Sequence, residues 1–138
     1  MDQYTHSNVA MVATQVRYWT EARGAVDRPY LNGWCAIAAG RLFNELAKLE
    51  IKCEIHAWVA DSGEAHVYVV VDDHIVDVTA TQFFEFRNEP VVIMHQREAE
   101  QYEFYQTVSV FHSVEDLRKW QKKGRWPKAQ LAYVEPRN

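Results

Sequence analysis

The sequence contains little of what several specialised protein classes require. Its 138 residues include only two cysteines, Cys35 and Cys53. Two are too few for a disulfide scaffold, and they lack the Cys-x-x-Cys spacing of redox and zinc motifs. No internal repeat or low-complexity segment is visible. We therefore expect both cysteines to be reduced thiols in an ordinary globular chain.

The sequence also lacks long apolar runs and an excess of positive charge. No run is long enough to span a bilayer, and no basic start precedes an apolar block at the N-terminus. The 15 Lys and Arg residues are outnumbered by 19 Asp and Glu residues, for a formal net charge of -4. Neither nucleic acid nor a membrane is therefore expected as a partner. We expect a cytoplasmic protein, although specialised export would leave no trace in these features.

What is present favours one domain over residues 1–138 with a substantial core. Hydrophobic residues make up 48% of the chain and charged residues 25%, as in ordinary globular proteins. A chain of this length buries enough surface to fold as one unit. The first third predicts two helices with apolar faces, Val9–Ala22 after a cap at Ser7 or Asn8, and Trp34 or Cys35 to Leu49.

After residue 50 the apolar pattern changes from helical spacing to alternation, which indicates strands. Predicted strands cover Ile51–Ala60, Ala65–Val71, Ile75–Thr79, Pro90–Met94 and Glu103–Phe111. A late helix is expected between the cap Ser113 and the stop Gly124, and residues 129–134 are expected as a final strand or an extended tail. Helices followed by mostly antiparallel strands predict an α+β fold.

Cys35 stands where the turn-forming stretch "LNGW" runs into the second predicted helix. A helix N-terminus lowers the pKa of a thiol because it offers positive partial charge and free backbone N–H groups. Free cysteine is, however, among the most buried residue types. This stretch by itself leaves Cys35 undecided between a core residue and a nucleophile.

The strands after residue 65 supply a possible partner pair for Cys35. If Asp72–Asp73 is the centre of a hairpin, paired residues have numbers that sum to 145. His66 and Asp77 then lie on one face as diagonal neighbours, about 7 Å apart and within reach of each other. The same register places one set of valines together on the opposite face, namely Val67, Val69, Val71, Val76 and Val78. The hydrophobic pattern and the His–Asp pairing therefore agree on one arrangement.

These residues define a hypothesis of nucleophilic catalysis. His66 accepts the proton of the Cys35 thiol, and Asp77 orients the imidazole and stabilises its charged form. The backbone N–H of Cys35 donates to the developing oxyanion. Candidates for a second oxyanion donor or for substrate binding are Asn32, Trp34 and Gln82.

The stretches "NGWCAIAAGRL" and "EAHVYVVVDDHIVDVTATQF", in this order, resemble the papain-like superfamily, and most closely its transglutaminase-like branch. The resemblance covers about Tyr30 to Phe83. It implies a helix-and-sheet core of that type, with Cys35 as nucleophile, His66 as general base and Asp77 as orienting acid. It implies no metal or other cofactor. In papain a glutamine shortly before the cysteine donates a hydrogen bond to the oxyanion, whereas here the nearest upstream glutamine is Gln15.

The resemblance implies acyl transfer through a thioester on an amide or ester. Transfer to water describes a peptidase, amidase or protein-glutamine deamidase, acting on a protein, a peptide or a small amide. Transfer to an amine describes a transglutaminase. The compact chain favours hydrolysis of a small or side-chain amide.

Two other hypotheses compete with an enzyme of this type. Cys53 and His56 offer metal-ligand chemistry, but they lie on opposite faces of a predicted strand, which makes joint chelation awkward. The same fold could also be a binding module without activity. Its surface would then involve scattered aromatic residues, namely Trp58, Tyr102, Phe104, Trp120 and Trp126.

Overall fold

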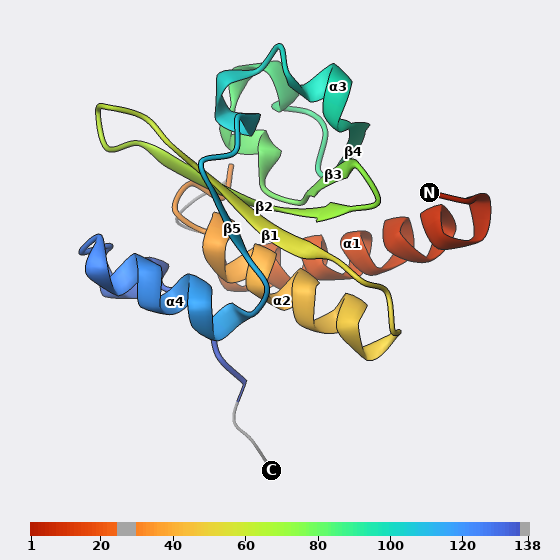
Figure 1. Cartoon of the computed structure of the whole chain (residues 1–138), viewed down its shortest axis with the longest axis horizontal. Coiled ribbons are helices and arrows are strands. Elements are labelled where there is room, and N and C mark those ends of the chain that lie inside the picture. The colour runs from red at the N-terminus through yellow and green to blue at the C-terminus, as the bar shows by residue number, and fades with distance from the viewer. Residues whose placement is uncertain (25–29, 136–138) are drawn as a thin grey trace.

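The computed structural model describes residues 1–24 and 30–135 of the chain (Figure 1). Its helices are α1 (Gln3–Gly24), α2 (Cys35–Lys48), α3 (Gln96–Ala99) and α4 (Val114–Lys123). Its strands are β1 (Glu54–Val59), β2 (Ala65–Val71), β3 (His74–Asp77), β4 (Val92–His95) and β5 (Ser109–Phe111). Short 3₁₀ turns cover Ala80–Gln82, Phe84–Phe86, Glu103–Tyr105 and Lys128–Gln130. The predicted α+β class is confirmed.

The strands form one sheet in the order β4-β3-β2-β1-β5, and each neighbouring pair is antiparallel. Figure 1 shows α1, α2 and α4 on one side of this sheet, and α3 with the turns around it on the other. Each side has its own core, because alternate residues of a strand point to opposite faces. Within the described residues, no helix is both long and apolar enough to cross a membrane.

The hairpin of β2 and β3 has the register that the sequence predicts. Val69 pairs with Val76, and Val71 pairs with His74. Asp72–Asp73 forms the turn, and both aspartates have positive φ angles, of 43° and 63°. A two-residue hairpin turn of the type I′ class needs positive φ at both positions, and aspartate tolerates it better than most residues. This turn therefore fixes which side chains share a face with His66.

The start of α2 is set by a tight turn. The Trp34 N–H donates to the Leu31 carbonyl over 3.1 Å, and Gly33 has a φ of 85°. Leu31 itself has a φ of 59° although its side chain is fully buried. The buried side chain therefore holds a backbone conformation that leucine seldom adopts. The result is a sharp entry that makes Cys35 the first residue of the helix.

The predicted start of the first helix is wrong. The helix begins at Gln3, because the Asp2 carboxylate accepts a hydrogen bond from the Thr5 N–H over 2.7 Å and so caps it. The Asn8 side chain instead donates to the Tyr4 carbonyl one turn earlier. Ser7 likewise lies inside the helix. The helix is thus capped by Asp2 and not by Ser7 or Asn8.

Several predicted strands are shorter in the structure. The strand expected from Ile51 begins only at Glu54. The strand expected over Glu103–Phe111 is a 3₁₀ turn followed by β5, because the consecutive residues Phe104 and Tyr105 are both buried in one core. Alternation along a strand does not allow this. Trp58 and Phe104, expected to be exposed, are also buried there, so they cannot form a binding surface.

The C-terminal segment has no strand within the part that the structure describes. It forms the turn Lys128–Gln130 and then extends along α4. The fully buried Gln121 amide holds it there, since it donates to the Gln130 carbonyl over 3.0 Å and accepts from the Ala132 N–H over 2.8 Å. The cap Ser113 and the stop Gly124 of α4 are confirmed.

Replacing Gln121 should loosen this segment. We expect Gln121→Ala to lower the free energy of unfolding by roughly 1–3 kcal/mol, because it leaves two backbone groups without their partner. Urea denaturation would measure the change. The exposed Lys122→Ala on the same helix is the control, with an expected change within about 0.5 kcal/mol. Equal stability of the two variants would contradict this role of Gln121.

Candidate active site

The site is built around a buried pair on β2 and β3. The His66 Nε2 atom lies 2.6 Å from Asp77 Oδ2. Both side chains are inaccessible to solvent, with relative exposures of 0% and 1%. The geometry confirms that these residues share a face of the hairpin. It makes the Nε2 proton of His66 a donor to the carboxylate.

Further donors hold the Asp77 carboxylate. The Thr79 N–H donates to Oδ1 over 2.9 Å, and the Tyr105 hydroxyl donates to Oδ2 over 2.7 Å. Burial by itself raises the pKa of Asp77, but the charge of His66 and these hydrogen bonds lower it below the ordinary value. Asp77 is therefore ionised and fixed in orientation. Tyr105 lies 28 residues further along the chain, and sequence reasoning did not single it out.

The His66 ring is enclosed by aromatic side chains. The centroid of its ring lies 4.8 Å from that of Phe83, in an edge-to-face contact, and 5.6 Å from that of Tyr68. Burial by itself lowers the pKa of His66, but the charge and hydrogen bond of Asp77 and the contact with Cys35 raise it to about 9. The aromatic enclosure leaves the ring little freedom to turn.

Cys35 lies against this pair and also faces a cavity. It is close enough to His66 to help raise the pKa of that ring, and because Nε2 serves Asp77, Nδ1 is the ring nitrogen on the side of the thiol. As the first residue of α2, Cys35 has a backbone N–H among those without a carbonyl partner inside the helix. The three predicted residues Cys35, His66 and Asp77 are thus brought together.

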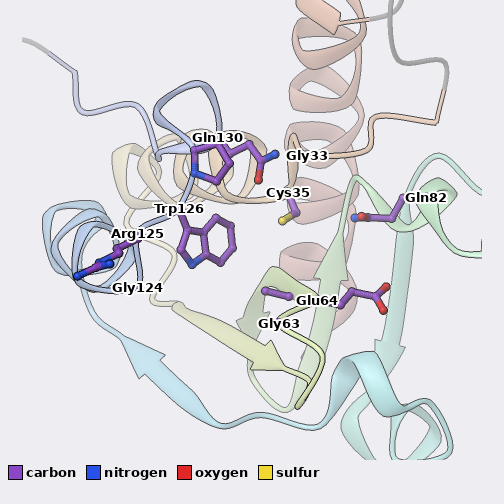
Figure 2. A pocket seen from close by; sticks show the side chains of 11 residues that line it. Gly33, Cys35, Gly63, Glu64, Gln82, Gly124, Arg125, Trp126 and Gln130 are labelled. Atoms are coloured by element: carbon purple, nitrogen blue, oxygen red, sulfur yellow. The ribbon is translucent and has the colours of Figure 1, made fainter.

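The cavity beside Cys35 has a volume of about 340 Å³. Figure 2 shows the thiol between the side chain of Gln82 on one side and the indole of Trp126 on the other, with Gln130 nearby. Arg125 lines the cavity but extends away from Cys35. The cavity therefore places both amide groups and an apolar ring beside the Cys35 thiol.

Gln82 acts on His66 directly. Its Nε2 atom donates to the Thr79 carbonyl over 3.1 Å and lies 3.1 Å from His66 Nδ1. Only one orientation of the amide lets it donate to that carbonyl, and this orientation presents an N–H to Nδ1. Gln82 therefore favours a neutral ring with a free electron pair on Nδ1, whereas Asp77 favours the charged ring.

The other two predicted oxyanion candidates lie away from the cavity. Asn32 is exposed and does not line it. The indole of Trp34 packs against Gly24, where an added Cβ would meet its Nε1 atom at 2.6 Å. That Nε1 atom is buried without a hydrogen-bond partner. Neither side chain lines the cavity, and Gln82 alone of the three does.

Sequence reasoning missed two further cavity residues. Gln130 was not singled out, and Trp126 was named only as one of several scattered aromatic residues. Both belong to the C-terminal segment that Gln121 holds, and they lie more than 90 positions after Cys35 in the chain. No local pattern links them to Cys35, since only the packing of α4 brings the segment there.

The second cysteine and its neighbourhood differ from this site. Burial, together with the charge of Glu54, raises the pKa of the Cys53 thiol to about 12. Both ring nitrogens of His56 have partners, Thr107 at 2.8 Å and Glu54 at 3.1 Å. Across residues 1–24 and 30–135, no three or more His, Cys, Asp or Glu side chains are grouped to hold a metal ion.

The opposing effects of Asp77 and Gln82 on His66 predict opposite shifts in two variants. In Asp77→Asn the pKa of His66 should fall by more than one unit, because the ring loses its ionic partner. In Gln82→Leu it should rise, because the N–H that opposes a proton on Nδ1 is gone. Nitrogen-detected NMR titration of the imidazole measures both. A pKa that is unchanged in Gln82→Leu would contradict the role of this amide.

The same pair makes stability depend on pH. Because the folded pKa of His66 is raised to about 9, its contribution to stability is complete below about pH 6.5, the value for an unfolded histidine. It is lost as pH rises through about 9. Urea denaturation across this range should therefore show falling stability in the wild type and a flatter profile in Asp77→Asn.

In comparisons with known proteins, no family model, no curated protein and no solved structure matches this chain.

Proposed function

We propose that this protein is a cysteine-nucleophile acyl-transfer enzyme of the papain-like superfamily, most similar to its transglutaminase-like branch. One observation carries the proposal. Cys35, at the first position of α2, contacts a buried imidazole that is bound to an ionised carboxylate, and the same thiol faces a cavity. This is the arrangement of nucleophile, base and orienting acid that acyl transfer requires.

The reaction follows from the two sides of the His66 ring. Nδ1 takes the proton of the Cys35 thiol, and Sγ attacks the carbonyl carbon of an amide, which becomes a tetrahedral oxyanion. The backbone N–H of Cys35 donates to that oxyanion. As the C–N bond breaks, Nδ1 returns the proton to the leaving amine. The products are a thioester on Cys35 and a free amine or ammonia.

Water completes the reaction as a hydrolysis. His66 removes a proton from the water molecule, which attacks the thioester and releases a carboxylic acid and the thiol. Asp77 stays ionised throughout and stabilises the imidazolium at each transfer. An amine in place of water would give transglutamination by the same steps.

Gln82 has a place in this sequence beyond that of an oxyanion donor. In the resting arrangement its N–H opposes a proton on Nδ1. Transfer of the thiol proton to Nδ1 removes that hydrogen bond, so the amide is then available to donate to a bound substrate. Formation of the reactive thiolate is thus coupled to the loss of the hydrogen bond between Gln82 and His66.

The cavity favours a side-chain or small amide as substrate. Its volume of about 340 Å³ lies at the small end of ligand sites, which suits one side chain more than an extended peptide. The indole of Trp126 can pack on methylene groups, and the amide of Gln130 can bond a polar end group. A glutamine side chain of a protein has both features, so hydrolysis would be deamidation.

Selective alkylation tests the nucleophile. Iodoacetamide at pH 7 should modify Cys35 at least tenfold faster than Cys53, because the high pKa of Cys53 leaves almost no thiolate. His66→Ala should slow the labelling of Cys35 at least tenfold and leave that of Cys53 unchanged, because only Cys35 depends on His66 to form its thiolate. Peptide mapping by mass spectrometry measures both rates, and Cys53→Ser is the control that retains a single reactive thiol. Equal slow labelling of both cysteines would contradict the proposal.

The reaction product distinguishes the classes of activity. Wild type and Cys35→Ala are incubated with glutamine-containing peptides and folded proteins, with and without a primary amine. A gain of about one mass unit at glutamine is expected, because replacement of –NH₂ by –OH marks deamidation. Cleaved chains would instead indicate a peptidase, and amine adducts with loss of ammonia a transglutaminase. Identical spectra for the two proteins over a broad substrate panel would overturn the proposed activity.

A further inference from the structure

A second cavity lies apart from Cys35, between the helical layer and the C-terminal segment. Its volume is about 460 Å³. We call it the basic groove, and its lining consists of Trp19, Arg23, Ile37, Arg41, Arg118, Lys128, Leu131 and Tyr133. These residues come from α1, α2, α4 and the segment after α4. The proposed reaction uses none of them.

The charge of the basic groove is opposite to that of the chain. Four of its eight lining residues are cationic, and none of the described lining residues is acidic, whereas the chain has a formal net charge of -4. Two carboxylates do approach it through Arg41, which lies 3.2 Å from Glu45 and 3.2 Å from Glu135. Even with both counted, the groove is a positive region on an acidic protein.

The guanidinium groups are positioned by the groove itself. Arg23 lies 4.3 Å and Arg41 5.0 Å from the centre of the Trp19 ring, over which both stack. Arg118 uses one nitrogen to donate to the Ala132 carbonyl over 2.6 Å, which leaves its other donors for a ligand. Held in this way, arginines lose little freedom when they bind carboxylates, and their planar groups suit two-point contacts.

The groove also has an apolar part. Ile37 is almost fully buried and Leu131 is half-buried, and both line the groove. The ring of Tyr133 is 48% exposed. Tryptophan, tyrosine and arginine are the residues that contribute most often to protein–protein binding energy. A ligand with carboxylates only would leave this apolar part uncovered.

We propose that the basic groove binds an acidic polypeptide segment that carries one large apolar side chain. The carboxylates of the segment meet Arg23, Arg118 and Lys128, and its apolar side chain packs on the apolar part of the groove. Charge complementarity selects this partner, because the rest of the acidic surface repels it and leaves the groove as the favourable contact.

The groove borders the cavity at Cys35 through the C-terminal segment. Lys128 and Leu131 line the groove, while Gln130 between them lines the cavity. A protein held in the groove therefore contacts the same short segment that forms one wall of the candidate active site. The binding itself does not depend on the proposed reaction.

Fluorescence anisotropy with labelled octapeptides tests the proposal. The probe is a peptide of glutamates around one phenylalanine, and the comparison peptides replace phenylalanine by serine or glutamate by lysine. The protein is full-length Cys35→Ala, so that catalysis does not consume the probe and a failure of the proposed activity leaves the result unaffected. We expect the Glu/Phe peptide to bind at least tenfold more tightly than either comparison peptide.

Charge reversal locates the binding. Arg23→Glu with Lys128→Glu should weaken binding of the Glu/Phe peptide at least tenfold. The control Lys52→Glu with Lys122→Glu changes net charge equally outside the groove, and should weaken binding less than twofold. Equal weakening by both pairs, or no preference for phenylalanine, would overturn the proposal. Competition by inorganic phosphate or ATP at equal concentration would also overturn it, in favour of a small-anion site, as would tighter binding of a single-stranded RNA.

Discussion

The hydrogen bond between His66 and Asp77 is the interaction on which the rest of the site depends. It joins two strands inside the protein, where neither charge has contact with water. Burial of such a pair lowers the stability of the fold unless the remaining hydrogen-bonding positions of both groups are occupied. Thr79 and Tyr105 donate hydrogen bonds to the Asp77 carboxylate, and aromatic rings enclose the imidazole of His66. The fold thereby presents one ring nitrogen, Nδ1, toward Cys35 and Gln82.

Two buried polar side chains hold the walls around this centre. Arg17 on α1 donates to the Val78 carbonyl over 3.0 Å and to the Thr81 hydroxyl over 2.8 Å, which fixes the chain just before Gln82. Gln121 on α4 holds the segment with Trp126 and Gln130 on the other side. Each is a helix residue that satisfies backbone groups of an irregular segment. The helical layer thus shapes the cavity, to which α2 also contributes Cys35.

Asp77 favours a proton on Nδ1 of His66, whereas the Gln82 amide opposes it. In the proposed enzyme these opposing effects control when the Cys35 thiolate forms. A thiolate that forms permanently is exposed to oxidation and unwanted alkylation. In the proposed mechanism, transfer of the thiol proton to Nδ1 requires the Gln82 amide to give up its bond to that atom. Substrate that engages the amide would therefore promote the transfer. The segment after α4 connects this chemistry to the basic groove.

The sequence alone determined the α+β class, the β2–β3 register and the meeting of His66 with Asp77, because alternation and a two-residue turn act over few positions. It also marked Cys35 as a helix start. Only the tertiary structure decided that Trp34 turns away, that Tyr105 completes the carboxylate, and that Trp126 and Gln130 form a wall of the cavity. These contacts join residues distant in the chain, and they depend on the packing of α1, α4 and the irregular segments, which have no periodic pattern.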